Sequence, residues 1–228
     1  MKIKNKVVLI IIILIGFNFI LKGNFKKVII NNSYKHDIMQ EENKNESDLI
    51  LVNKTHSLDE SYKPEDLVIP KIPFLNNTTE EERHMKKEAA KAIEKLFKKA
   101  HQEGINIIGS SAYRSYEEQE KVYKHNIDVR GEKEAKKYAA IPGNSEHQTG
   151  LAIDVTNEDR WFDKSTKEAK WIANNAYKFG FILRYPEGKE DITGYNYEPW
   201  HIRYVGKDVA KAIHNKGITL EEYIKNNS

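Results

Sequence analysis

The apolar positions of the chain fall into three stretches with different patterns. An almost unbroken apolar run covers Val7 to Leu21, and a mostly polar stretch without a sustained period follows it. From Asp48 onward, short apolar segments alternate with polar ones at regular spacings, as in a globular domain. We therefore divide the chain into a signal or membrane anchor, a flexible linker and one folded domain, at residues 1–23, 24–47 and 48–228.

The N-terminal run has the features of an export signal or a short membrane anchor. A lysine-rich start precedes about 15 apolar residues, and no small-x-small cleavage site follows closely. The run is shorter than the roughly 20 residues usual for a span, although Lys22 can extend it by reaching toward the interface. We favour an uncleaved single-pass anchor, with the folded domain outside the cell membrane. A cleaved signal would instead give a protein secreted to the cell wall.

Helical and strand-like patterns interleave within residues 48–228 without an internal repeat. Apolar residues at helical spacing predict a long helix that begins at a capping box around Thr79 and Glu82 and ends at Gly104. Further helices are predicted at 115–129, 132–140, 167–180, 207–217 and 219–226, and strands at 105–113, 150–156, 181–185 and 199–205. This mixture lacks βαβ regularity and indicates a single small α+β domain.

Composition excludes several classes of function. The net charge is only +3 and the lysines and glutamates are intermixed, so we expect no nucleic acid partner. The chain has no cysteine, which excludes disulfides, thiolate nucleophiles and Cys-type zinc sites. Any metal site must therefore use histidine and carboxylate ligands.

One predicted strand carries an acid within its apolar run. Side chains alternate along a strand, so the Leu, Ile and Val of GLAIDV (150–155) share a core-facing side and Asp154 points to the other. In PWHIRYV (199–205), His201 and Arg203 project together from one face. If both strands belong to one sheet, Asp154 and His201 meet over its polar face, and His147 reaches the same place from the preceding loop.

Two imidazoles and one carboxylate make a zinc ligand set that leaves a fourth position open, as in catalytic sites. Glu198, three residues before His201, is a candidate general base for a water activated by the metal. Pro199 disfavours a helix here, so this is not a helical HExxH site. Each residue also has an ordinary interpretation: His147 as a solvated loop residue, Asp154 as a turn residue and His201 as an edge histidine.

Arg114 ends the predicted strand 105–113 just before a helix. At that position its guanidinium could hold a carboxylate-ended ligand through two parallel hydrogen bonds. The alternative is a surface ion pair with Glu117 or Glu118.

These residues occur in motifs that resemble a known family. SEHQTGLAID (145–154) is similar to the SxHxxGxAxD motif, and EPWH (198–201) to the ExWH motif, of zinc D-alanyl-D-alanine carboxypeptidases of the VanY type. That family belongs to the wider lysostaphin–hedgehog-like group of metallopeptidases. SAYRSYEEQ (111–119) resembles the family's arginine motif, and the similarity extends over about residues 51–205.

The resemblance implies a role for each motif residue. His147, Asp154 and His201 would bind one Zn²⁺ per chain, and Glu198 would be the catalytic base. Arg114 would bind the substrate carboxylate or the developing oxyanion, and Gln119 and Ser145 would line the substrate pocket. The implied fold is a small α+β domain with the site on a central antiparallel sheet flanked by helices. The loops 157–166 and 186–197 would shape the pocket.

The implied function is removal of the C-terminal D-alanine from peptidoglycan stem peptides, a D,D-carboxypeptidase activity, by a monomeric enzyme. One alternative is an L,D-carboxypeptidase acting on tetrapeptide stems, which the motifs do not distinguish from the D,D activity. A second is an endopeptidase that cuts cross-links in a groove open at both ends. A third is a zinc-containing wall-binding module without activity, against which Glu198 argues, because a binder needs no base.

Overall fold

A four-stranded antiparallel sheet is the centre of the folded domain. The computed structural model describes residues 48–227, and the predicted anchor and linker lie outside these described residues. The strand order is β3-β4-β6-β5, and every neighbouring pair is antiparallel. The strands are β3 (Ile108–Ser111), β4 (Ala152–Thr156), β5 (Phe181–Leu183) and β6 (His201–Tyr204). This confirms the expected α+β fold with a central antiparallel sheet.

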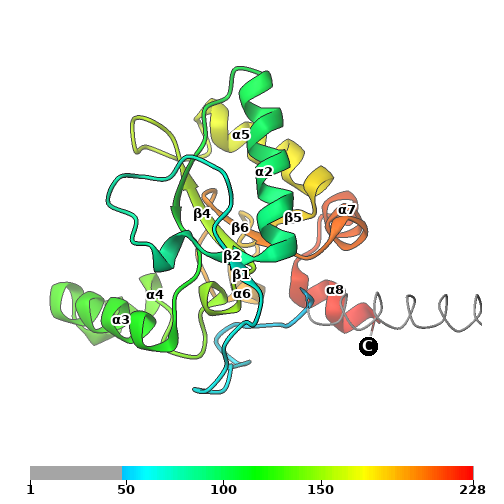
Figure 1. Ribbon diagram of the computed structural model, residues 1–228. Helices are drawn as coiled ribbons and strands as arrows, with labels where there is room; N and C mark the ends of the chain where they lie inside the picture. Colours follow the sequence, from blue (N-terminus) through cyan, green and yellow to red (C-terminus); the bar gives the residue numbers. More distant parts are fainter. Residues whose placement is uncertain (1–47, 228) are drawn as a thin grey trace, which may run out of the picture. The chain divides into compact units, whose positions relative to one another are not determined.

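The longer helices surround this sheet (Figure 1). Helices α2 (Lys87–Gln102) and α5 (Lys167–Asn175) share one apolar core with the sheet, and α7 (Lys207–Lys216) and α8 (Leu220–Asn227) enclose a second, smaller cluster beside β5. Helices α3 (Tyr116–Arg130) and α4 (Glu132–Tyr138) pack on each other at a distance from α2 and α5 (Figure 1). Among residues 48–227, no helix combines the length and the apolar character needed to cross a bilayer.

Several short elements complete the domain. A two-stranded antiparallel sheet pairs β1 (Leu67–Val68) with β2 (Met85–Lys86). The remaining short elements are the 3₁₀ turns η1 (Glu81–Arg83), η2 (Glu146–Thr149) and η3 (Ala176–Phe179) and the helix α6 (Glu190–Thr193). The predicted helix over 167–180 is thus divided into α5 and η3, and Gly180 follows them in a left-handed conformation.

Strand β4 separates the core from the face that carries Asp154. Leu151, Ile153 and Val155 are almost completely buried in the core shared with α2 and α5. Burial of each such side chain stabilises the fold by about 1.5–3 kcal/mol. Because successive side chains point to opposite sides of a strand, the same burial directs Asp154 to the other face. The predicted alternation of this strand is confirmed.

The long helix begins later than its sequence pattern predicts. Thr79 and Glu82 do form a capping box, in which Glu82 N donates to Thr79 Oγ1 over 3.2 Å and Thr79 N donates to Glu82 Oε2 over 3.1 Å. The box, however, lies at the 3₁₀ turn η1, and the chain then becomes extended at Met85–Lys86 to pair with β1. The helix therefore starts at Lys87, and it ends at Gln102, close to the predicted Gly104.

Two arginines lie completely buried on the side of the sheet opposite α2. Arg184 Nε and Arg203 Nη1 each donate to Glu146 Oε1 over 2.7 Å. Arg184 also makes two hydrogen bonds to the Glu221 carboxylate of α8, at 3.0 and 2.6 Å. We call Glu146, Arg184, Arg203 and Glu221 the buried charge cluster. It attaches the C-terminal helix to the sheet.

The outer carboxylate of this cluster should matter for stability. Glu221→Gln removes one charge that compensates the buried Arg184, so we expect the free energy of unfolding to fall by about 2 kcal/mol and the melting temperature by about 4–8 °C at pH 7. Glu222→Gln is the matched control, since Glu222 pairs with the partly exposed Lys189 and glutamine can keep its cap hydrogen bond to Thr219 N. Equal melting temperatures for the two variants would contradict this role.

The loss of stability in Glu221→Gln should depend on pH. Burial raises the pKa of Glu221, but the charge of Arg184 outweighs burial and lowers it. A lowered carboxyl pKa contributes stability that is present above the unfolded-state value of about 4.3 and is lost as the pH falls through the folded-state pKa. The difference in melting temperature between the wild type and Glu221→Gln should therefore shrink as the pH is lowered below about 4.

Candidate active site

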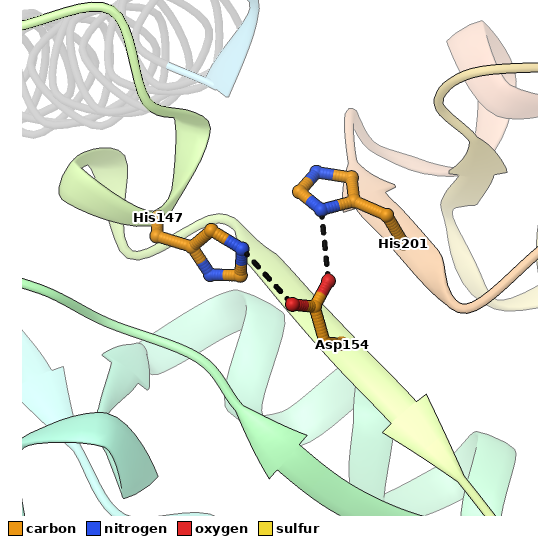
Figure 2. A group of neighbouring side chains, drawn as sticks. All are labelled: His147, Asp154 and His201. Carbon is orange, nitrogen blue, oxygen red and sulfur yellow. Dashed lines mark hydrogen bonds and ion pairs between the residues drawn. The ribbon is translucent and has the colours of Figure 1, made fainter. Parts of the chain in front are cut away.

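Three side chains that can ligate a metal ion meet at the sheet (Figure 2). Asp154 extends from β4, His201 lies directly opposite it on β6, and His147 reaches the same point from η2. One ligand atom from each residue lies within 4.8 Å of the others. Figure 2 shows both imidazole rings pointing toward the Asp154 carboxylate. The structure therefore brings together the three residues that the sequence indicates as ligands.

Gly150 sets the spacing between His147 and Asp154. Its φ of 68° is left-handed, and it turns the chain from η2 toward β4. A Cβ at this position would lie 2.8 Å from Leu67 Cδ2 and 3.2 Å from the backbone nitrogen of Lys86. Only glycine satisfies both the backbone conformation and the close contact. The glycine of the motif thus allows a short connection between two candidate ligands, His147 on η2 and Asp154 on β4.

Hydrogen bonding defines the protonation of His147. Its Nδ1 lies 2.6 Å from the carbonyl oxygen of Ala112, which can only accept, so Nδ1 carries the proton. The unprotonated Nε2 then faces Asp154 Oδ2 at 3.4 Å. Two atoms with lone pairs facing each other in a buried place favour a cation between them. This arrangement is the one expected of a metal-binding histidine.

His201 is held between two carboxylates. Its Nδ1 lies 2.9 Å from Asp154 Oδ1 and its Nε2 lies 3.4 Å from Glu146 Oε2. Burial lowers the pKa of His201, but the hydrogen bonds to Asp154 and Glu146 outweigh burial and raise it to about 9. The two carboxylates thus favour the protonated form of this ring. Two imidazole nitrogens and one carboxylate oxygen, with an open fourth position, fit zinc.

The Asp154 carboxylate is the negative centre of the site. Burial raises its pKa, but the positive charges that His147 and His201 carry when protonated outweigh burial and hold the pKa well below its ordinary value. The Arg114 guanidinium lies 3.5 Å from Asp154 Oδ2. Arg114 thus faces the site and contacts Asp154. It does not form the surface ion pair with Glu117 or Glu118 that was the alternative.

All seven residues that the sequence indicates as site residues line one cavity of about 250 Å³. Those beyond the three candidate ligands are Arg114, Gln119, Ser145 and Glu198. Arg114 Nη1 donates to Gln119 Oε1 over 3.1 Å, and Gln119 Nε2 donates to the Ala140 carbonyl over 2.8 Å. Gln119 therefore holds the guanidinium of Arg114 at the wall of the cavity.

Glu198 lies in the same cavity, in the segment before β6. Burial raises the pKa of Glu198 to about 7, against the opposing charges of His201 and Arg114. A carboxyl group with a pKa near neutrality can both take and return a proton. Its place and its environment suit the proton-transfer role that the sequence suggests.

The buried charge cluster also reaches the candidate ligands, and the sequence does not indicate this. Glu146 precedes His147 in the chain, but its carboxylate contacts the other histidine, His201. Burial raises the pKa of Glu146, and the charges of Arg184 and Arg203 outweigh burial and keep it ionised. An ionised acceptor beside Nε2 holds the proton on that nitrogen and leaves Nδ1 free to face Asp154 and a metal ion. The only local signal for this role is the position of Glu146 next to a candidate ligand.

Glu146 should therefore influence metal binding. We expect Glu146→Gln to lower the affinity for Zn²⁺ by about 10- to 100-fold, measured by competition with a chromophoric chelator. Glu221→Gln is the control, because Glu221 belongs to the same buried charge cluster but does not contact His201. Unchanged affinity in Glu146→Gln, or an equal loss in both variants, would show that Glu146 only supports the fold.

Comparisons with known proteins agree with this geometry. YodJ of Bacillus subtilis (strain 168), named as a carboxypeptidase, is 46% identical over 185 residues, which cover 79% of this chain and 68% of YodJ. The structure of the LdcB LD-carboxypeptidase is 46% identical, with a TM-score of 0.72, covering 77% of this chain and 84% of LdcB. A mutant of the vancomycin resistance D,D-pentapeptidase VanY, solved with Zn(II), is 32% identical to this chain, with a TM-score of 0.66. The match covers 78% of this chain and 99% of that VanY chain.

The family profile described as "VanY: D-alanyl-D-alanine carboxypeptidase" matches residues 82–207. This range contains every residue of the candidate site and more than half of the chain. The family match therefore includes the motif glycine, the two histidines and the carboxylates around them. The chain belongs to the VanY family of D-alanyl-D-alanine carboxypeptidases.

Proposed function

We propose that this protein is a zinc carboxypeptidase that removes the C-terminal D-alanine from peptidoglycan stem peptides. The observation that carries the proposal is the meeting of His147, Asp154 and His201 in a cavity that also contains Glu198 and Arg114. These residues supply a metal site, a base and a cation for a carboxylate within one cavity. The Zn(II) found with the related VanY enzyme supports zinc as the metal.

His147, Asp154 and His201 would hold the zinc ion. Bound there, zinc would be a Lewis acid, which would polarise the scissile carbonyl group and make water a stronger nucleophile. Glu198 takes the proton of the attacking water and returns it to the leaving amine, for which a pKa near 7 is suited. The overall reaction is a hydrolysis: water adds across the peptide bond, which breaks, and the products are D-alanine and the shortened stem.

Arg114 gives the cavity its preference for a chain end. Its guanidinium is fixed by Gln119 and by Ser111, whose hydroxyl accepts from Arg114 Nε at 3.0 Å. A preorganised guanidinium binds the terminal carboxylate, or stabilises the oxyanion, without reorganisation. If Arg114 binds the terminal carboxylate, it favours a carboxypeptidase over an endopeptidase, whose substrate has no carboxylate at this place.

We further propose that residues 1–23 anchor the protein in the cell membrane and that residues 24–47 place the catalytic domain outside it, near the nascent wall. The basic start and the apolar run of the sequence support this arrangement. A single catalytic domain on a short linker suits a substrate that lies close to the membrane surface.

The second candidate is an L,D-carboxypeptidase acting on tetrapeptide stems. The similarity to the LdcB LD-carboxypeptidase, at 46% identity, favours it. The same ligands, base and arginine would serve either reaction, because both release a terminal D-alanine. The difference lies in the residue that precedes the scissile bond.

Replacing the base tests the mechanism. We expect Glu198→Gln to lower kcat by about 10²- to 10⁴-fold, because glutamine cannot accept the proton of water, while one zinc ion per chain remains bound. The control is Glu187→Gln, which changes an exposed glutamate paired with Lys164 in the neighbouring loop. Activity is followed as D-alanine release and metal by elemental analysis. Full activity in Glu198→Gln would remove Glu198 from the proton-transfer role.

A comparison of two substrates tests the proposed reaction. The wild-type protein should release D-alanine from a defined pentapeptide, and a chelator should stop the release until zinc is restored. A tetrapeptide assayed in parallel measures the L,D activity. Faster release from the tetrapeptide would favour the second candidate, and no release from either peptide by the zinc-loaded protein would favour a binding module.

A further inference from the structure

A second hollow adjoins the candidate active site. It has a volume of about 420 Å³, and Asp154 and Trp200 line both this hollow and the catalytic cavity. Its other lining residues include Ser110 of β3 and Arg160, Trp161 and Asp163 of the loop that follows β4. The two hollows thus share the Asp154 carboxylate and the Trp200 side chain as parts of their walls.

Two of the chain's three tryptophans line this hollow in exposed positions. Trp161 is 66% exposed and Trp200 is 36% exposed, whereas Trp171 is buried against α2 and the sheet. Large aromatic side chains bury much apolar area when a ligand covers them and lose little conformational freedom in doing so. Two such side chains beside a reaction centre are a binding surface for the part of the substrate that leaves the catalytic cavity.

The loop that carries Trp161 is held in a strained shape. Arg160 has a φ of 53°, the only positive value among the non-glycine residues that the structure describes. The buried Asn157 fixes the loop: its Oδ1 accepts from Trp161 N and its carbonyl accepts from Arg160 N, both at 3.1 Å. Left-handed conformations at residues other than glycine cost roughly 1–3 kcal/mol and concentrate at binding sites. The hydrogen bonds to Asn157 hold the loop in this shape, with Trp161 in the wall of the hollow.

The orientation of the substrate decides which part of it enters this hollow. If the terminal carboxylate lies at Arg114, the leaving residue occupies the cavity beside Gln119 and Ser145. The chain that precedes the scissile bond then passes Asp154 and Trp200 toward Trp161. An extended chain advances about 3.3 Å per residue, so the sugar of a pentapeptide stem lies about 13 Å from the scissile bond. The residues nearest this hollow are therefore peptide residues.

Resting on the proposed function, we propose that the hollow between Trp161 and Trp200 is a subsite for the two or three peptide residues that come before the penultimate residue of the substrate. The indole rings cover the apolar parts of these residues, and Arg160 offers a positive charge to an acidic stem residue. Substrates that reach this subsite bind better than substrates too short to reach it. The wild-type preference for long peptides then depends on Trp161.

The test compares Trp161→Ala with the wild type on an N-acetylated D-alanyl-D-alanine dipeptide, a stem pentapeptide and a disaccharide pentapeptide. We expect kcat/KM for both longer substrates to fall by about fivefold to tenfold, mainly through KM, and that for the dipeptide to stay within about twofold. The matched control is Ile69→Ala, which removes another exposed apolar side chain after β1 and should change none of the three values.

Three outcomes would overturn the subsite. Equal losses on all three substrates would show that Trp161 supports the fold, and no loss on any would show that it does not bind substrate. A loss only on the disaccharide pentapeptide would place the sugar, and not the peptide, against Trp161.

A binding measurement keeps this test separate from the proposed function. If the wild-type protein releases no D-alanine at all, the proposed function fails, and the subsite is judged by tryptophan fluorescence. The pentapeptide, and not the dipeptide, should then protect the wild-type fluorescence from acrylamide quenching, and the protection should be smaller in Trp161→Ala, in which Trp200 still lines the hollow. Equal quenching with and without pentapeptide would overturn the subsite independently of catalysis.

Discussion

The site depends on the contact between the Asp154 carboxylate and the two buried imidazoles that face it. This contact exists because β4 and β6 pair antiparallel with Asp154 directly opposite His201. A register shift of one residue would turn Asp154 into the core and bring Ile153 to the site. The apolar burial of Leu151, Ile153 and Val155 prevents that shift. The hydrophobic core therefore fixes the position of the candidate metal ligands as well as the stability of the sheet.

The buried charge cluster solves a second problem, the orientation of His201. Removing ionised groups from water costs several kcal/mol for each ion, and the cluster compensates by placing Glu146 against both Arg184 and Arg203. An apolar replacement would avoid this cost but would leave the second nitrogen of His201 without an acceptor. The cluster thus links the C-terminal helix, through Glu221 and Arg184, to the protonation of a metal ligand.

Local patterns in the sequence predicted most of the secondary structure and, together with the resemblance to a known family, the group of residues around the cavity. Strand alternation was sufficient to put Asp154 and His201 on one face, because that property depends only on neighbouring residues. The start of α2 could not be predicted in this way, because Met85–Lys86 becomes extended to pair with Leu67–Val68, far away in the sequence. The role of Glu146 could not be predicted for the same reason: its two arginine partners, Arg184 just after β5 and Arg203 on β6, come much later in the sequence.

The catalytic roles of these residues all rest on one claim, that His147, Asp154 and His201 hold a single zinc ion. X-ray absorption at the zinc edge of the zinc-saturated protein tests this claim most directly, since it counts imidazole ligands. The structure predicts one zinc ion per chain with two imidazole nitrogens and carboxylate oxygen in its first coordination shell, and one imidazole fewer in His201→Ala. A stoichiometry near zero, or a coordination shell without two histidines, would contradict the account.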